Sequence, residues 1–218
     1  VWCVGRDLEW FRSDPWVIEV NPRIWCPVLN GISLTIRPRC SGRNYDKVWN
    51  RDLDESPLRT FTRSQADLVG KDLEPWCGGC IKVDWAMRYG SPSIESGLNS
   101  LLDAGCTRIL LFPLYPQYSA STTATANDKA FQVMRKMRNQ PAIRTVPPYY
   151  NHPAYISALE TSIVRFLESS AWTPDIILAS FHGIPKSYAD NGDPYPDHCR
   201  ETVRLLATCP GLKDVDLR

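Results

Sequence analysis

The chain has 218 residues, of which 43% are hydrophobic and 22% are charged, a composition typical of a folded globular protein. Its formal net charge of +1 excludes a general electrostatic attraction to nucleic acid or to an anionic membrane. The longest apolar runs are far shorter than the roughly 20 residues of a membrane span, and no secretory signal is recognisable. The sequence therefore predicts a soluble protein, which we expect in the cytoplasm.

Residues 22–57 form the least regular part of the N-terminal region. They are rich in Trp, Pro and Arg, with Trp25, Pro27, Pro38 and Trp49 among them. This composition predicts either a long loop or a broken helical hairpin.

The eight cysteines include one closely spaced pair, Cys77-Gly78-Gly79-Cys80. A two-residue gap is used by metal knuckles and redox dithiols, but no second pair follows at the spacing of a zinc ribbon. We therefore interpret this segment as a glycine-rich turn. In a chain without a secretory signal we expect reduced thiols.

The pattern between residues 81 and 114 predicts a strand, a helix and a second strand. Residues 81–87 alternate as a strand does. Apolar residues then recur at helical spacing until Gly105 ends the run. Residues 108–114 are expected to form the next strand, which completes one βαβ unit.

The same alternation continues towards the end of the chain. Asn127 is expected to cap a helix that runs through Met137, with a strand at residues 143–146 after it. An apolar stripe over residues 156–167 predicts another helix. A nearly continuous apolar run at 175–181 predicts a buried parallel strand, and a further helix is expected to begin at Glu201. The chain is thus expected to have an α/β fold with two linked halves.

His182 follows the strand expected at residues 175–181. In open α/β sheets, ligands bind outside the carboxyl ends of the strands, so this position makes His182 a candidate functional residue. An imidazole accepts a proton or holds a borderline metal ion, but one nitrogen does not do both at once. The sequence leaves both roles open, together with a purely structural one.

Several separate motifs resemble those of bacterial ferrochelatases, in that family's order and at roughly its spacing. They are residues 112–123 (FPLYPQYSASTT), Met87-Arg88-Tyr89-Gly90, Ser180-Phe181-His182-Gly183-Ile184-Pro185 and Gly192-Asp193-Pro194-Tyr195-Pro196. The likeness extends from about Arg6, where residues 6–15 resemble the family's first helix and its exit, to about Leu212.

The resemblance implies a chelatase-like fold of two Rossmann-like half-domains with parallel sheets, the second one incomplete. Residues 1–150 would form the first half-domain, with a lip at about 22–57 over the porphyrin cleft. Residues 151–218 would begin the second half-domain and carry the strand before His182. In this family the lip is often associated with a membrane surface or a partner.

The resemblance also implies a reaction, the insertion of ferrous iron into protoporphyrin IX in the last step of protohaem synthesis. Iron and porphyrin would be substrates, with no permanently bound cofactor. His182 would be the catalytic or metal-binding residue. The porphyrin would be contacted by Arg88, Tyr89, Tyr115, Gln117, Tyr118 and Ser119. A guanidinium suits a propionate carboxylate, and tyrosine rings offer apolar faces to a macrocycle.

Each of these residues also has a structural interpretation. Arg88 could form a surface ion pair, and the tyrosines could belong to the core or to a turn. We expect the hydroxyls of residues 121–123 to cap the helix that follows. Asp193 could lie behind His182 as a second acid, or it could belong to a rigid turn fixed by two prolines.

Two parts of the family pattern are missing from the chain. These are the first strand, with its Asn-Leu-Gly-Thr-Pro-like turn, and most of the C-terminal half, which carries a catalytic Glu. An uncovered sheet edge is therefore expected. Ala120 stands where animal members carry an iron–sulfur ligand, so no cluster of that arrangement is expected. These departures support a second hypothesis, a catalytically incompetent porphyrin-binding remnant, and the oligomeric state stays open.

Overall fold

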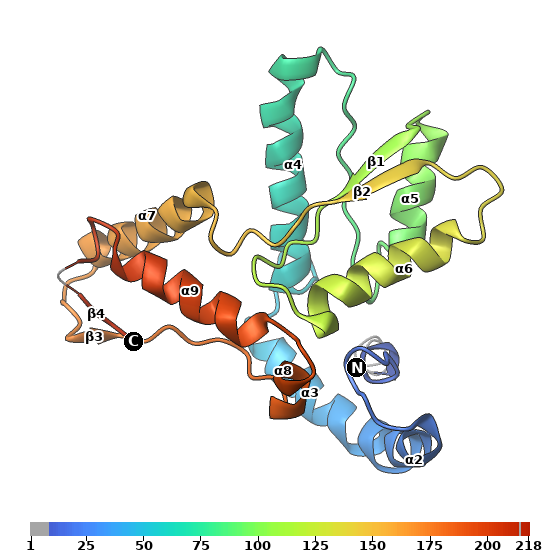
Figure 1. The fold of residues 1–218 in the computed structure, drawn as a ribbon, viewed down its shortest axis with the longest axis horizontal. Helices are drawn as coiled ribbons and strands as arrows, with labels where there is room; N and C mark the ends of the chain where they lie inside the picture. Colours follow the sequence, from blue (N-terminus) through green and yellow to red (C-terminus); the bar gives the residue numbers. More distant parts are fainter. Residues whose placement is uncertain (1–8, 214) are drawn as a thin grey trace. The chain divides into compact units, whose positions relative to one another are not determined.

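The computed structural model describes residues 9–213 and 215–218, and these form a mixed α/β structure. The chain divides into two compact units (Figure 1). The first runs up to Leu111 and also contains residues 125–144. The second consists of residues 112–124 and 145–218. The expected domain boundary near residue 150 stays a prediction.

The N-terminal region is helical where the structure describes it. Residues 9–12 are helical, whereas residues 6–8 of the expected first helix lie outside the described residues. After a turn come the helix α2 (Pro22–Val28), the π-helix η1 (Leu29–Ser33) and the helix α3 (Leu34–Val48). Of the two alternatives for residues 22–57, the structure therefore shows helices rather than a long loop. Asn21 starts α2 by accepting a hydrogen bond from the backbone of Arg23.

The helix α4 (Pro57–Cys77) begins at Ser56, whose side chain accepts a hydrogen bond from the backbone of Arg59. It ends at Gly78, which has a φ of +56°, and Gly79 follows with a φ of +83°. Both values lie in the left-handed region that glycine adopts without strain. The prediction of a glycine-rich turn at residues 77–80 is confirmed.

The expected strand at residues 81–87 is wrong. Only Met87 pairs, in an isolated bridge with Ser93. Ile81 and Val83 are 48% and 38% exposed, so the alternating pattern is present without a buried face. A strand needs a neighbouring ladder, and none lies beside residues 81–86 in the described part of the chain.

The core of the first unit lies where the sequence predicts a helix and strands. The helix α5 (Ile94–Asp103) is capped by Ser93, and the turn after it places Gly105 at a φ of +82°. The strands β1 (Arg108–Leu111) and β2 (Ala142–Thr145) form a two-stranded sheet. Buried side chains from α5, β1 and the helix α6 (Thr125–Met134) pack together, namely Ile94, Leu98, Ile109, Ala130, Val133 and Met134.

Two expectations about the start of α6 are wrong. Asn127 does not cap this helix but lies inside it, and residues 121–123 belong to a π-helix, η2 (Ala120–Ala124), that directly precedes it. The turn begins earlier because the carbonyl oxygen of Ser119 accepts hydrogen bonds from the backbones of Thr122 and Ala124. The Ser119 hydroxyl also accepts one from the backbone of Ser121 at 3.3 Å, so Ser119 takes the capping role.

The second unit packs the helices α7 (Pro153–Ser169) and α9 (Tyr195–Ala207) around a small core of Ile156, Leu206, Cys209 and Leu212. The strands β3 (Ile176–Ile177) and β4 (Asp216–Leu217) pair in parallel, with Ile176 opposite Asp216. A short helix, α8 (Lys186–Asp190), lies between β3 and α9 in the chain.

The strand expected at residues 175–181 is therefore much shorter than predicted, and it is not buried. Ile176 is 42% exposed, Leu178 is 74% exposed and Phe181 is 38% exposed. The only partner of β3 among the described strands is the two-residue β4, and the backbone pairing ends where the Ala179 N–H donates to the Arg218 carbonyl at 2.7 Å. The helix predicted from Glu201 begins earlier, at Tyr195.

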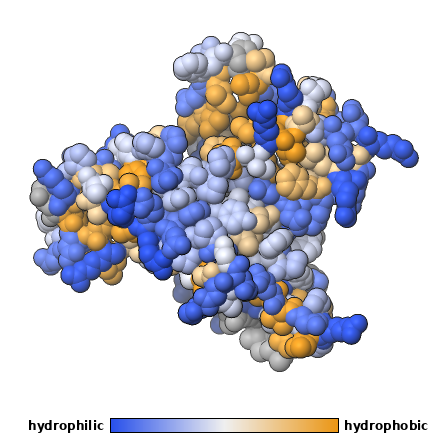
Figure 2. Space-filling model, in the orientation of Figure 1, coloured by the Kyte–Doolittle hydropathy of each residue, from blue (hydrophilic) through white to orange (hydrophobic). Residues whose placement is uncertain are grey.

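Aliphatic and Phe side chains also reach the surface along α4 (orange in Figure 2), and Leu58, Phe61, Leu68 and Val69 are all more than two-fifths exposed. Trp76, near the end of the same helix, is 86% exposed. These side chains do not form a membrane span. Within residues 9–213 and 215–218, no helix has the length and hydropathy to cross a bilayer.

Candidate functional site

The predicted site residues fall into both units. Arg88 and Tyr89 belong to the first unit, whereas Tyr115, residues 117–119 and His182 belong to the second.

Arg88 and Tyr89 converge on a buried carboxylate, that of Asp14. The Arg88 Nη2 atom forms an ion pair with Asp14 Oδ2, and the Tyr89 hydroxyl donates a hydrogen bond to the same oxygen at 2.9 Å. The Thr125 hydroxyl donates to it as well. The side chain of Asp14 is only 2% exposed and that of Arg88 is 17% exposed. Burying this charge is costly unless it is paired and hydrogen-bonded, and here the Oδ2 atom alone has three donors.

Further contacts fix the orientation of the arginine. Arg88 Nε donates to the Thr125 hydroxyl at 2.7 Å and to the Thr125 carbonyl at 3.0 Å. The guanidinium carbon lies 4.4 Å from the centre of the Tyr89 ring, and Phe11 meets that ring edge-on at 5.4 Å. Burial raises the pKa of Tyr89 above its usual range, so the phenol stays neutral and remains a donor.

Asp14 is held by the turn that ends the first helix. Its Oδ1 atom accepts a hydrogen bond from the backbone of Trp16 at 2.9 Å, and its carbonyl accepts from the backbones of Val17 and Ile18. Sequence reasoning placed Asp14 at a helix exit but assigned it no role. The signal was an Asp at a turn, which is too common a feature to indicate a partner 74 residues away.

In the second unit, the turn at residues 117–120 is attached to the segment that begins α9. The Gln117 side-chain amide donates to the Thr202 hydroxyl at 3.1 Å. The backbone of Tyr118 donates to His198 Nδ1 at 3.1 Å. The Ser119 hydroxyl and the backbone of Ala120 both donate to Asp193 Oδ2 at 2.9 Å.

Gln117 and Ser119 are 9% and 1% exposed, so their side chains point into the unit. Tyr115 is 40% exposed and presents part of its ring to solvent. Their assignment as porphyrin contacts stays a prediction, but the structure brings residues 117–119 together with the Gly-Asp-Pro-Tyr-Pro segment. Two motifs about 75 residues apart in sequence thus form one local structure.

Asp193 takes the structural role that the sequence analysis weighed. Besides the bonds to Ser119 and Ala120, its Oδ1 atom accepts from the backbone of Tyr195 at 3.0 Å, at the start of α9. The preceding Gly192 has a φ of +103°, which allows the sharp entry into this segment. Both carboxylate oxygens are therefore used within the turn.

His198 was not singled out from the sequence. Its ring stacks on Tyr150, with centroids 3.7 Å apart and planes 11° apart. One turn later on α9, the Thr202 hydroxyl lies 2.9 Å from the carbonyl oxygen of His198 and 3.0 Å from that of Tyr150. Burial lowers the pKa of His198, against the opposing effect of Asp197 and Asp193, which favours the neutral ring.

His182 lies in the loop between β3 and α8, five residues after Ile177, and its side chain is exposed. It is therefore not directly at the end of a strand, as the sequence suggested. Its backbone interacts with the Tyr195 hydroxyl, a group whose pKa is raised to about 12, mainly by burial. The loop is thus tied to α9 while the imidazole remains accessible.

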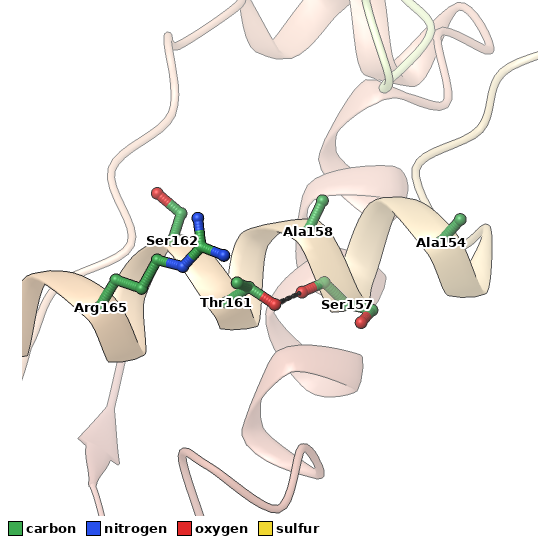
Figure 3. A pocket seen from close by; sticks show the side chains of 6 residues that line it. All are labelled: Ala154, Ser157, Ala158, Thr161, Ser162 and Arg165. Carbon is green, nitrogen blue, oxygen red and sulfur yellow. Dashed lines mark hydrogen bonds between the residues drawn. The ribbon is translucent and has the colours of Figure 1, made fainter. Parts of the chain in front are cut away.

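Within residues 9–213 and 215–218, the structure shows no other candidate site of comparable chemistry. In the described part of the chain, no three His, Cys, Asp or Glu side chains gather as a metal site would require. A shallow hollow on α7 lies among short side chains and Arg165, and contains none of the predicted site residues (Figure 3). Its one marked hydrogen bond joins the Thr161 hydroxyl to the Ser157 carbonyl, within the helix itself.

Comparisons with known proteins agree on one family. A family model described as Ferrochelatase matches residues 4–218. The chain is 56% identical over 208 residues to the ferrochelatase of Rhizobium meliloti (strain 1021), covering 94% of this chain and 60% of that protein. It is 54% identical over 201 residues to that of Mesorhizobium japonicum, covering 92% and 56%, and 54% identical over 213 residues to that of Brucella anthropi, covering 98% and 60%. The chain thus spans somewhat more than half the length of these relatives.

Proposed function

The chain belongs to the ferrochelatase family, and on that premise we propose that it acts in the insertion of ferrous iron into protoporphyrin IX, the last step of protohaem synthesis. The observation that carries this proposal is the exposed imidazole of His182 on a loop anchored to α9 through Tyr195. Both substrates would bind from solution, and neither is a permanent cofactor.

The reaction sets three physical demands. Two pyrrole protons must leave the porphyrin, water must leave the metal ion, and the flat macrocycle must bend so that its nitrogen lone pairs face the ion. An accessible imidazole meets the first demand as a proton acceptor, or the second as a ligand that replaces water. We propose His182 for one of these two roles, and the anchored loop keeps its position constant during the step.

Arg88 is proposed to contact a propionate of the porphyrin, but through one nitrogen only. Its Nε and Nη2 atoms are bonded to Thr125 and Asp14. Among the described residues, Nη1 has no hydrogen-bond partner, and it is the nitrogen left for a ligand. The two-pronged pairing that a free guanidinium would make is therefore not expected here.

Aromatic rings are proposed to form the apolar wall of the porphyrin site. Tyr115 presents a partly exposed ring, and Tyr118 follows in the anchored turn. Tyr89 would contribute through its ring face, since its hydroxyl is engaged by Asp14. Gln117 and Ser119 would act by shaping the turn, because their side chains are buried.

The finer architecture is part of the same proposal. We infer two Rossmann-like half-domains with parallel sheets, divided near residue 150, and a helical lip at about 22–57 that contacts a membrane surface or a partner. The parallel pairing of β3 with β4 and the helical form of α2 and α3 support these assignments. A cytoplasmic location also stays a proposal.

A second candidate function is porphyrin binding without turnover. It applies if His182 has to act outside a complete metal site, since no three His, Cys, Asp or Glu side chains gather in the described part of the chain. The chain would then keep the aromatic wall but lack the partner that completes the chemistry.

The experiment that tests both functions is zinc insertion into a soluble protoporphyrin analogue, followed by the change in porphyrin emission. The purified chain is compared with His182→Ala and with Lys186→Ala, an exposed side chain in the adjacent helix α8. Turnover that is lost only in His182→Ala supports the enzyme. Binding without turnover in all three proteins supports the second function. Absence of porphyrin binding contradicts both.

A further inference from the structure

We propose that His198 is a positioning residue that fixes the porphyrin-binding turn at residues 117–119, and that protonation of its Nδ1 atom releases this turn. The inference rests on the proposed function, because residues 117–119 are assigned there to the porphyrin site. It assigns to α9 a role that none of the motifs in the sequence indicated.

The turn is held by three consecutive residues. Gln117 is bonded to Thr202, Tyr118 to His198, and Ser119 to Asp193. The partners come from one continuous segment, the entry and first two turns of α9. The two outer bonds use side chains of the turn, whereas the central bond uses the Tyr118 backbone N–H. A change at His198 therefore acts on the backbone of the turn and not merely on one side chain.

The geometry specifies the form of the imidazole. Nδ1 lies 3.1 Å from the Tyr118 nitrogen and accepts a hydrogen bond from its N–H, so Nδ1 must carry a lone pair and the ring proton must be on Nε2. Stacking on Tyr150 at 3.7 Å fixes the plane of the ring. Only the neutral ring with its proton on Nε2 can make this bond.

Protonation reverses the interaction. An imidazolium carries N–H groups on both nitrogens, so a donor at Nδ1 would face the donor of Tyr118. The charged groups that face His198 are Asp197 on its own helix and Asp193 before that helix, and from other segments it meets the ring of Tyr150 and the backbone N–H of Tyr118. The two carboxylates favour the charged ring, but burial outweighs them and lowers the pKa of His198. The turn is thus held at neutral pH and released only at a pH below that at which an ordinary histidine is protonated.

Release of the turn would weaken the porphyrin site by a measurable factor. One partly buried N–H loses its acceptor, which corresponds to a fall of about tenfold in the fraction of molecules with the turn in place. We expect porphyrin affinity to fall by the same factor when the imidazole is protonated.

The test compares the chain with His198→Asn and His198→Leu. The Oδ1 atom of asparagine takes the place of Nδ1 and accepts a hydrogen bond at every pH, whereas leucine removes the acceptor. The first readout is the amide signal of Tyr118 in protein labelled with ¹⁵N-tyrosine, followed from pH 8 to pH 5. The second readout is the dissociation constant for a soluble porphyrin over the same range, from fluorescence.

We expect the Tyr118 amide of the wild-type chain to shift and exchange faster in acid, and that of His198→Asn to stay constant. Porphyrin affinity should fall about tenfold in acid for the wild type relative to His198→Asn, since porphyrin ionisation is common to both. His198→Leu should bind weakly at every pH. If His198→Leu fails to fold, the difference in pH dependence between the wild type and His198→Asn still tests whether protonation of His198 releases the turn.

Equal pH profiles of the Tyr118 amide in wild type and His198→Asn would overturn the release of the turn. A Tyr118 titration without any difference in porphyrin affinity would overturn the positioning role. A wild-type chain that binds no porphyrin at any pH would overturn the proposed function, and this outcome is distinguished by the amide titration, which needs no ligand.

Discussion

Arg88 and Asp14 form an ion pair in which the carboxylate is almost completely buried and the guanidinium is largely so. The pair joins the turn after the first helix to the Met-Arg-Tyr-Gly segment, 74 residues further along the chain. Tyr89 and Thr125 bond to the same carboxylate oxygen, so one side chain orders three others. The arginine expected to meet the porphyrin thus depends for its position on a residue that would not itself touch the ligand.

Asp14→Asn is expected to destabilise the chain by about 3 kcal/mol, because it leaves the Arg88 charge buried without its partner. Urea unfolding followed by tryptophan fluorescence measures this loss. The matched control is Asp46→Asn, which removes an exposed ion pair with Arg51. The Asp46 side chain is 63% exposed and the Arg51 side chain is 66% exposed. That change should cost less than about 1 kcal/mol. Equal losses for the two variants would show that the buried pair contributes no more than a surface pair.

Ser119 and Asp193 are expected to be energetically coupled. Ser119→Ala should cost about 1 kcal/mol, since it removes one hydrogen bond from a buried hydroxyl. Asp193→Ala should cost about 2 kcal/mol, because the backbones of Ala120 and Tyr195 also lose their acceptor. In the double variant the two losses should fall short of their sum by about 1 kcal/mol.

Urea unfolding of the four proteins of this cycle gives the coupling free energy. The exposed residue Thr161 serves as a control partner for Asp193, since its hydroxyl bonds only within α7. Asp193→Ala combined with Thr161→Ala should be additive. If the losses in unfolding free energy for Ser119→Ala and Asp193→Ala were also additive, the hydrogen bond between these residues would not hold the turn.

The sequence predicts best those elements whose signals are local. The helices α5 and α7 are found from apolar residues at helical spacing, and Gly105 marks the end of α5 correctly. The turn at residues 77–80 follows from its glycines. The strands at 81–87 and 175–181 are overestimated, because alternation or apolarity in one segment carries no information about whether a neighbouring strand is present to complete the ladder.

The candidate site is predictable only in part, for the same reason. Motifs identified Arg88, residues 117–119 and Asp193, but not the residues to which they bond. The bonds to Asp14, His198 and Thr202 join residues 74 to 85 positions apart and leave no local pattern. The π-helix before α6 was missed because its hydroxyl residues resemble an ordinary cap, whereas Ser119 starts the turn earlier.

Tyr195 gives an alkaline limit to stability. Its pKa is raised to about 12, mainly by burial, whereas an unfolded tyrosine titrates near 10. Between these values the unfolded chain binds fewer protons than the folded chain. The contribution of Tyr195 to the free energy of unfolding is therefore fully present below pH 10 and is lost as the pH rises towards 12. Allowing for its partial exposure, the contribution is about 1 kcal/mol.

Tyr195→Phe should flatten this decline, and urea unfolding between pH 8 and pH 11 measures it. Because the Tyr195 hydroxyl also interacts with the backbone of His182, the variant should loosen that loop and increase its cleavage by protease. The control is Tyr45→Phe, at a ring that is 49% exposed, which should change neither property. If the stability of Tyr195→Phe declined with rising pH as steeply as that of the wild type, the decline would have to come from other titrating groups.

Gly211 lies where the chain leaves α9 and passes close to α7, and it leaves no room for a side chain. A Cβ atom there would come within 2.8 Å of Val164 Cγ2 and 3.1 Å of Glu160 Oε1, while the Gly211 backbone donates to that same Oε1 at 2.7 Å. The branched valine cannot swing aside, so Gly211→Ala should destabilise the chain by about 2 kcal/mol. The matched control is Gly42→Ala in α3, where a Cβ would meet nothing within 4 Å and alanine should stabilise the helix by up to about 1 kcal/mol. Urea unfolding with opposite signs for the two alanines supports a tight contact between α7 and the end of α9, and a neutral Gly211→Ala would contradict it.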